Sequence, residues 1–383
     1  MLALRLARGA HPLVLLRRLL VAAASAGVGF LLLCTLGYAV GHPAHSTGSA
    51  LRLLWCLAPL AATVHFAVAV ARTDPSTSPR AGLSGAGLGP VRLTALAAVS
   101  TAVSCTLGSA VALLFYLHLR GDLTGLPFDG AGAELLAAGR PMPVAAALTL
   151  LCLVPLTAAA ASALALRPRP VKPTDDTAAA PHRAPTGLPW GVALTAAGLA
   201  VEAYANRGAP GAALPLPGRL DVVPAGVLAG WALTALGLAL VGPGLTYLCG
   251  WVIQSIRPGA MRLLAGRVLM DEAHRIGRPL GVVCAVASGA IAASTLYGGD
   301  GGARPFGPLT GLGAALVMSC TVATLLTAAL EAKHARTSTT KALLRLGAPT
   351  QTLRGAATLR TIALLTVFVP LTWAVAGLAA LPF

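Results

Sequence analysis

The stretch from Asp271 to His274 reads Asp-Glu-Ala-His and has the form of a Walker-B segment of a nucleotide hydrolase. ATP hydrolysis of that kind also needs a P-loop, G-x-x-x-x-G-K-[ST], in which a lysine follows a glycine. None of the three lysines follows a glycine; they are Lys172, Lys333 and Lys341. The sequence therefore predicts that this chain does not hydrolyse ATP. We interpret Asp271 and Glu272 as the acidic first turn of a helix at the membrane interface, where negative charge is favourable.

The other reactive side chains show no spacing typical of an active site. Each cysteine lies in an apolar run, and no two are close in sequence, whereas zinc sites and disulfide frameworks need clustered cysteines. The seven are Cys34, Cys56, Cys105, Cys152, Cys249, Cys284 and Cys320. We interpret them as small apolar residues packed between helices. No G-x-S-x-G, H-E-x-x-H or C-x-x-C occurs. We expect no catalytic residue, no cofactor and no metal in this chain.

Ionisable residues inside the apolar runs test whether the chain carries ions. Ion-coupled carriers usually place Asp, Glu or His at mid-membrane. Here Glu202 lies near the outer end of one apolar run and Glu331 at the inner end of another. His65 lies well inside a run, and we interpret it as a neutral histidine bonded to a neighbouring helix. This distribution disfavours an ion-coupled carrier.

The elements that hold these residues are predicted membrane spans. The chain has 383 residues, 56% hydrophobic and 10% charged, whereas soluble proteins carry about 25% charged residues. A bilayer needs about 20 apolar residues per helix, and nine runs qualify: Leu19–Val40, Ala50–Ala71, Val91–Leu117, Pro143–Leu166, Leu188–Tyr204, Val222–Ile256, Pro279–Tyr297, Leu309–Leu330 and Ala356–Leu381. The first is too long for a signal peptide and is expected to stay uncleaved. Pro224 and Pro243 are expected to bend the sixth.

The distribution of Lys and Arg predicts the orientation, because cytoplasmic loops carry the excess. With the N-terminus inside, 22 of the 28 basic residues lie on the inner side. The six outer ones are Arg52, Arg120, Arg140, Arg207, Arg219 and Arg304. This asymmetry explains the net charge of +16 without nucleic acid as a partner. We expect a bacterial inner-membrane protein with a cytoplasmic N-terminus and a C-terminus outside.

The chain also resembles itself. Residues 50–73 align without gaps on 314–337, with Cys56 on Cys320 and Thr63 on Thr327. We therefore expect an all-α polytopic protein with two repeated core units joined by a middle pair of helices. The first unit would be 1–166 with four spans and the second 257–383 with three. A proline-rich segment at 167–187, typical of extended chain, is expected to be a cytoplasmic linker before two connecting spans in 188–256.

The most informative segment is Glu331 to Arg354, EAKHARTSTTKALLRLGAPTQTLR, on the predicted inner face between two spans. Lys341, Leu343, Leu344 and Arg345 would form a short helix with a leucine ridge between cationic edges. Gly347 is expected to end this helix, as glycine commonly does. Thr350 and Thr352 can cap the helix that follows.

This segment resembles the FtsX-like (MacB-type) permease superfamily of ABC transporters. Ala342 to Ala348, ALLRLGA, matches an A-L-L-R-x-L-G-A type sequence of that family, one residue shorter than the common spacing. The resemblance implies a coupling helix at 335–348 that docks on a separate, dimeric ATPase, which would bind ATP and Mg. The docking residues would be Arg336, Lys341, Leu343, Leu344, Arg345, Leu346 and Gly347, with Arg72 and Arg80 in or beside a counterpart at 74–87.

The chain departs from the family pattern in three places. The counterpart at 74–87 is rich in Gly and Pro and would be a poor helix. The outer loops are short where many members carry a large domain, and the second unit has three spans where the family has four.

The function expected is therefore a permease subunit that moves or extracts an amphiphile, such as a peptide, a lipid or a drug-like compound. The partners would be an ABC ATPase and the lipid bilayer. The alternatives are a sensory component that signals antimicrobial compounds and, third, an ion-coupled carrier.

Overall fold

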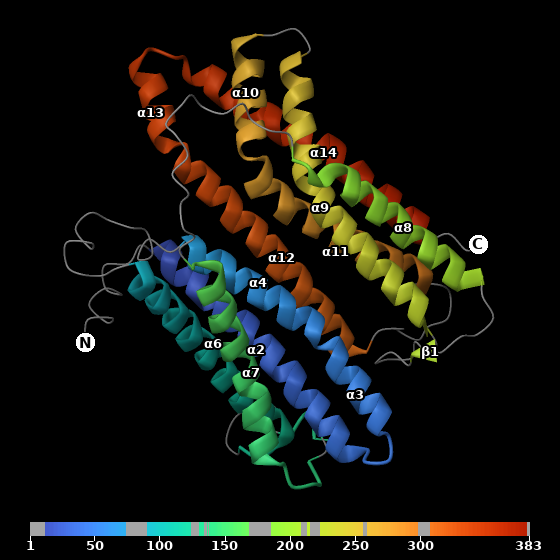
Figure 1. Cartoon of the computed structure of the whole chain (residues 1–383). Coiled ribbons are helices and arrows are strands. Elements are labelled where there is room, and N and C mark those ends of the chain that lie inside the picture. The colour runs from blue at the N-terminus through green and yellow to red at the C-terminus, as the bar shows by residue number, and fades with distance from the viewer. Residues whose placement is uncertain are drawn as a thin grey trace. The chain divides into compact units, whose positions relative to one another are not determined.

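The computed structural model describes residues 12–73, 90–123, 130–133, 136, 138–167, 185–207, 213–214, 223–255, 259–297 and 307–380. Helices dominate these residues (Figure 1). In chain order they are α2 (Pro12–Gly41), α3 (Ser46–Trp55), α4 (Leu57–Thr73), α6 (Pro90–Arg120), α7 (Val144–Ala165), α8 (Gly187–Arg207), α9 (Ala225–Ser255), α10 (Ala260–Asp271), α11 (Ala273–Tyr297), α12 (Pro308–Ala335), α13 (Thr337–Arg345) and α14 (Thr350–Ala380). Two short strands, β1 (Ala213–Leu214) and β2 (Val223–Pro224), pair antiparallel between α8 and α9.

The predicted spans are confirmed as helices. Nine helical segments in the described residues are long and apolar enough to cross a membrane, and each overlaps one predicted run. Three of the helices are especially long: α6, α9 and α14 each have 31 residues. At 1.5 Å per residue such a helix is about 46 Å long, more than the roughly 30 Å of a bilayer core. The chain is a multi-pass membrane protein whose helix ends extend beyond the hydrocarbon.

The helices form two compact units. The first contains α2, α3, α4, α6, α7 and the start of α12 as far as Cys320. The second contains α8, α9, α10, α11, α13, α14 and the rest of α12. The predicted connecting spans, α8 and α9, thus pack with the helices that follow them. The predicted repeat of two core units stays a prediction.

The two segments that align in sequence differ in shape. Residues 50–73 form α3 and α4 with a turn at Cys56, whereas residues 314–335 run without a break through α12. Pro59 explains the turn, because a proline ring clashes with the carbonyl four residues earlier, here that of Trp55. The segments meet in the first unit, where the Thr63 Oγ1 lies 3.7 Å from the Cys320 Sγ.

Of the two prolines predicted to bend the sixth span, one lies inside the helix and the other does not. Pro243 lies inside α9, as predicted for a bend. The prediction for Pro224 is wrong, because this residue belongs to β2 and the helix begins only at Ala225. A proline just before a helix has no intrahelical hydrogen bond to remove.

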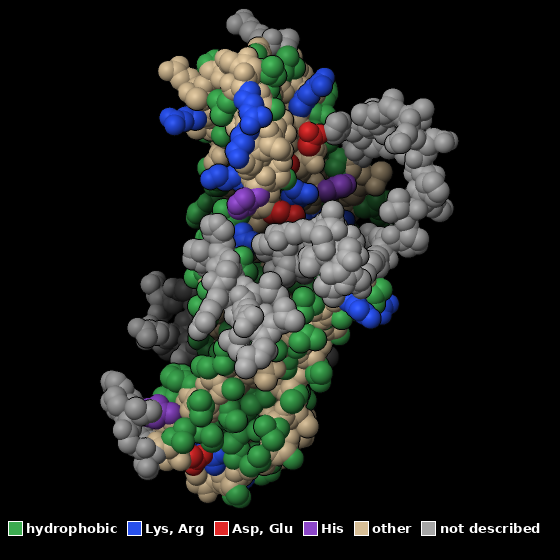
Figure 2. Space-filling view, turned by 90° about the vertical axis from the view of Figure 1, so that its left-hand side faces the viewer, with side chains coloured by type: hydrophobic (Ala, Val, Ile, Leu, Met, Phe, Trp, Pro, Cys, Tyr) green, Lys and Arg blue, Asp and Glu red, His purple; other side chains and the backbone are tan. Residues whose placement is uncertain are grey.

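The first unit exposes apolar side chains on its flank. Along α6, Val103, Leu107 and Leu114 are each more than half exposed, at 63%, 56% and 58%. In Figure 2 green hydrophobic side chains cover this unit, and blue Lys and Arg side chains gather on the second. Continuous apolar surface of this extent belongs in lipid.

The second unit is held together by close contact between helix backbones. Gly191 of α8 faces α9, where an added Cβ would lie 2.7 Å from the Val241 backbone N and 2.9 Å from the Gly237 O. On the other side of α9, a Cβ at Gly277 of α11 would lie 2.6 Å from the Pro243 Cα. Lipid tails are as apolar as leucine, so membrane helices associate through such close packing rather than through the hydrophobic effect.

We expect Gly191→Ala to destabilise the α8–α9 pair, because the new methyl group meets backbone atoms that cannot rotate away. Overpacking of this kind costs about 1–3 kcal/mol. The measurement is the melting temperature of the purified protein in mild detergent. Gly289→Ala in α11 is the matched control, since nothing lies within 4 Å of a Cβ there. An equal loss in both variants, or none in Gly191→Ala, would contradict the close-contact explanation.

Candidate functional site at the base of helix α13

Helix α13 is the short helix that the sequence predicted between the last two spans. It covers Thr337–Arg345, shorter at both ends than the predicted 335–348. Gly347 ends it as expected, with a φ of +84° that glycine adopts without strain. The Gly347 N–H donates to the Leu344 O (3.1 Å), and the Ala348 N–H donates to the Leu343 O (3.0 Å). These two bonds form a Schellman motif, which fixes the turn into α14.

Helix α13 is not covered by the other described residues. The helix has no buried residue. Leu344 is 42% exposed, Leu346 just beyond the helix is 84% exposed, and Leu343 is half-buried. Lys341 and Arg345 are both exposed. Apolar and cationic side chains are thus presented together on one short helix between α12 and α14 (Figure 1).

An ion pair fixes the other end of α13. The Arg336 Nε lies 3.1 Å from the Glu272 Oε1, and the exposed fractions of the two side chains are 29% and 10%. Arg336 stands between α12 and α13, and its Nε also donates to the Ala332 O. Glu272 stands between α10 and α11, where its backbone carbonyl accepts the N–H groups of Arg275 and Ile276. The pair therefore joins two helix junctions.

A second arginine approaches the same carboxylate from α14. The Arg360 Nε donates to the Ala356 O at 3.2 Å. The Arg360 Nη1 is buried and donates a hydrogen bond to no atom of the described residues. Burial raises the pKa of Glu272, and the charges of Arg336, Arg360 and Arg275 oppose that rise without cancelling it. We call Glu272, Arg336 and Arg360 the junction cluster.

The junction cluster suits a mechanical role. The Glu272 carboxylate binds the guanidinium of Arg336, so a displacement of α13 acts directly on the start of α11, and the charge of Arg360 on α14 lies close enough to act on the same carboxylate. The described residues contain no group of three His, Cys, Asp or Glu that could hold a metal ion.

The structure places the predicted docking residues in different settings. Lys341, Leu343, Leu344, Arg345 and Leu346 lie together on α13 and its C-terminal turn. Arg336 does not face outward with them, because Glu272 holds its guanidinium. Arg72 is exposed in the last turn of α4, in the first unit. Arg80 and the segment 74–87 lie outside the described residues.

Sequence reasoning missed Glu272 and Arg360. Glu272 had been interpreted only as an acid in the first turn of a helix, and Arg360 had been counted only as an inner charge. One signal was available: Arg360 lies eleven residues into α14, in an otherwise apolar stretch. A charge at such a position needs a partner.

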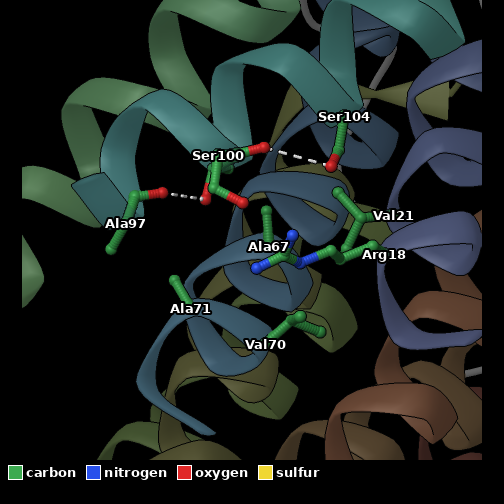
Figure 3. Close-up of a pocket in the computed structure, with 9 residues that line it drawn as sticks. Arg18, Val21, Ala67, Val70, Ala71, Ala97, Ser100 and Ser104 are labelled. Atoms are coloured by element: carbon green, nitrogen blue, oxygen red, sulfur yellow. Dashed lines mark hydrogen bonds between the residues drawn. The ribbon is translucent and has the colours of Figure 1, made fainter. Parts of the chain in front are cut away.

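A small cavity in the first unit contains another arginine (Figure 3). Arg18 of α2 lies there among residues of α4 and α6. The hydroxyls of Thr101 and Ser104 donate to the Ala97 O (3.0 Å) and the Ser100 O (3.1 Å). The cavity has a volume of about 20 Å³. This is enough for one water molecule and far below the volume of a ligand pocket.

Comparisons of the chain with protein-family models, with curated proteins and with solved structures give no match.

We expect Glu272 and Arg336 to be energetically coupled. A double-mutant cycle of Glu272→Gln and Arg336→Gln, read as melting free energies in detergent, should give a coupling of about 0.5–3 kcal/mol, as contacting residues do. The control cycle pairs Glu272→Gln with Arg354→Gln, whose side chain is exposed. That cycle should be additive within about 0.5 kcal/mol. Additivity in both cycles would show that the ion pair does not hold the junctions.

The raised pKa of Glu272 predicts a pH dependence. Folding favours the neutral carboxyl, so its contribution to stability is fully present below the ordinary pKa of 4.5 and is lost as the pH rises through the raised value. The difference in melting temperature between the wild type and Glu272→Gln should therefore fall as the pH rises from 4.5. It should level off once the carboxyl is ionised. If the difference in melting temperature grew with pH, the pKa of Glu272 would be lowered by folding and not raised.

Proposed function

We propose that this chain is the membrane-spanning subunit of an ATP-driven transporter, and that α13 is the surface on which a separate ATPase docks. The observation that carries the proposal is the exposed, amphipathic α13 held rigidly at both ends. Lys341, Leu344 and Arg345 are exposed and Leu343 is half-buried, while Arg336 and Gly347 fix the two ends of the helix.

A docking helix must transmit force, and the contacts around α13 are suited to it. The helix is continuous in sequence with two long membrane helices, α12 and α14. The junction cluster adds a third path, through Glu272, to the start of α11. A push on α13 would reach three membrane helices without an intervening flexible loop.

The resemblance of Ala342 to Ala348 to the coupling segment of FtsX-like permeases supports the same role. In this scheme the partner ATPase binds ATP and Mg. It moves α13 when the nucleotide bound to the ATPase changes. The cargo would be an amphiphile, such as a peptide, a lipid or a drug-like compound, which can enter between the helices from the membrane. The sensory alternative predicts the same membrane helices, and no feature of the described residues favours it.

The experiment is affinity purification of the chain from its own host in mild detergent, with identification of any bound ATPase. Leu343→Asp and Leu344→Asp should each remove the ATPase, because a carboxylate replaces the apolar contact and sits between cations. Ser338→Asp adds the same charge about one and a half turns earlier, on the opposite face of α13 from the two leucines. It should retain the ATPase. Size-exclusion chromatography shows whether each variant is folded.

Two outcomes would overturn the proposal. If the wild type brings down no ATPase, the docking role is wrong. If Ser338→Asp and Leu344→Asp lose the ATPase equally while both stay folded, the leucine ridge is not the contact.

A further inference from the structure

Glu202 is the most deeply buried acid among the described residues. It lies in the fifth span, in α8, with a side chain only 4% exposed. Its Oε2 has no hydrogen-bond partner among the described residues. Five residues separate it from the end of α8, about 7 Å along the helix axis. The sequence placed Glu202 correctly near one end of its span but gave no sign that its carboxyl would face a neighbouring helix.

The closeness of α8 and α9 explains the burial. A Cβ at Gly230 of α9 would lie 2.5 Å from the Glu202 Cγ and 2.8 Å from the Gly198 O. The Glu202 side chain therefore lies against bare backbone of α9. One turn further along α9, Thr234 packs against Gly198 in the same way, with a side chain 6% exposed and a hydroxyl to which no described residue is hydrogen-bonded. Two unpaired polar groups thus share one interface.

No charge compensates Glu202 from the helices packed against it. Helix α9 contains no Asp, Glu, Lys, Arg or His. Helix α14 also contacts α8 and runs in the same direction (Figure 1), but its charges, Arg354 and Arg360, lie in its first eleven residues. Glu202 lies at the other end of α8, which itself carries one further charge, at its last residue, Arg207.

We propose that Glu202 is a proton-binding site inside the α8–α9 pair. A carboxylate without a cation or a hydrogen-bond donor is strongly disfavoured in a water-free interface, whereas the neutral carboxyl is tolerated. The bound proton makes Glu202 a donor, and the Thr234 hydroxyl is the one hydroxyl in the first half of α9 that could share it. Glu202 can release the proton only when α8 and α9 separate enough to admit water.

This inference is independent of ATPase docking. It assigns a ligand, the proton, to a part of the second unit that the junction cluster does not include. It predicts that opening of the α8–α9 pair depends on pH.

Infrared spectroscopy of the full chain in lipid vesicles tests the proposal. At pH 7 the wild type should show the carbonyl band of a protonated carboxyl, shifted in heavy water, and Glu202→Gln should lose that band. Glu331→Gln removes an acid from α12 and should retain it. Dicyclohexylcarbodiimide, an apolar reagent that adds to protonated carboxyls, should label Glu202 in peptides analysed by mass spectrometry, and less so as the pH is raised.

Two conservative variants test whether a loss of the band could come from misfolding. Thr234→Val keeps the shape of the side chain and should leave the band in place but change its frequency, because the neighbouring hydroxyl is lost. Glu202→Asp should keep a protonated carboxyl. A wild-type spectrum without the band at pH 7, a band that survives in Glu202→Gln, or no carbodiimide on Glu202 would each overturn the proposal.

Discussion

The constraint on which this structure depends is that the membrane core offers no water to backbone or side-chain polar groups. Backbone N–H and C=O groups must then bond within their own helix, which is why all nine apolar runs are helical in the described residues. Hydroxyls obey the same rule: Thr157, Thr246 and Thr366 each donate to a carbonyl one turn earlier. Others donate across a helix interface, as Ser25 does to the Cys105 O, so a buried carboxyl such as that of Glu202 without a partner among the described residues is an exception that needs an explanation.

The same constraint changes what holds helices together. In water, apolar side chains drive packing, but in lipid they are equally well solvated on the outside, as the exposed α6 flank illustrates. The second unit relies instead on glycine contacts such as Gly191 with Gly237 and Gly277 with Pro243. Such contacts leave almost no space between backbones. A side chain as large as Glu202 can be enclosed there only because a glycine lies opposite it.

Much of the fold follows from hydropathy, and little of the site does. The spans, the turn at Gly347 and the short helix before it were predictable because each depends on local sequence. The ion pair of Glu272 with Arg336 was not, because 64 positions separate the two residues in the chain and neither has a motif that names its partner. The burial of Glu202 likewise depends on α9, and the absence of Pro224 from that helix shows that even local rules fail at boundaries. The sequence pattern indicates which segments lie in lipid. Which side chains contact one another depends on how the helices pack.

Glu272 and Glu202 show how one residue type acquires two roles in this way. Both are removed from water, and burial disfavours the charged form of each. Glu272 forms an ion pair with Arg336, and the charges of Arg336 and Arg360 both favour its ionised form, so that it links two helix junctions. Glu202 lies against the glycine backbone of α9, and no charged side chain of α9 compensates a negative charge there. The neighbouring groups therefore determine the role that we propose for each carboxyl. Glu272, beside arginines, transmits force between helix junctions, and Glu202, against glycine, holds a proton.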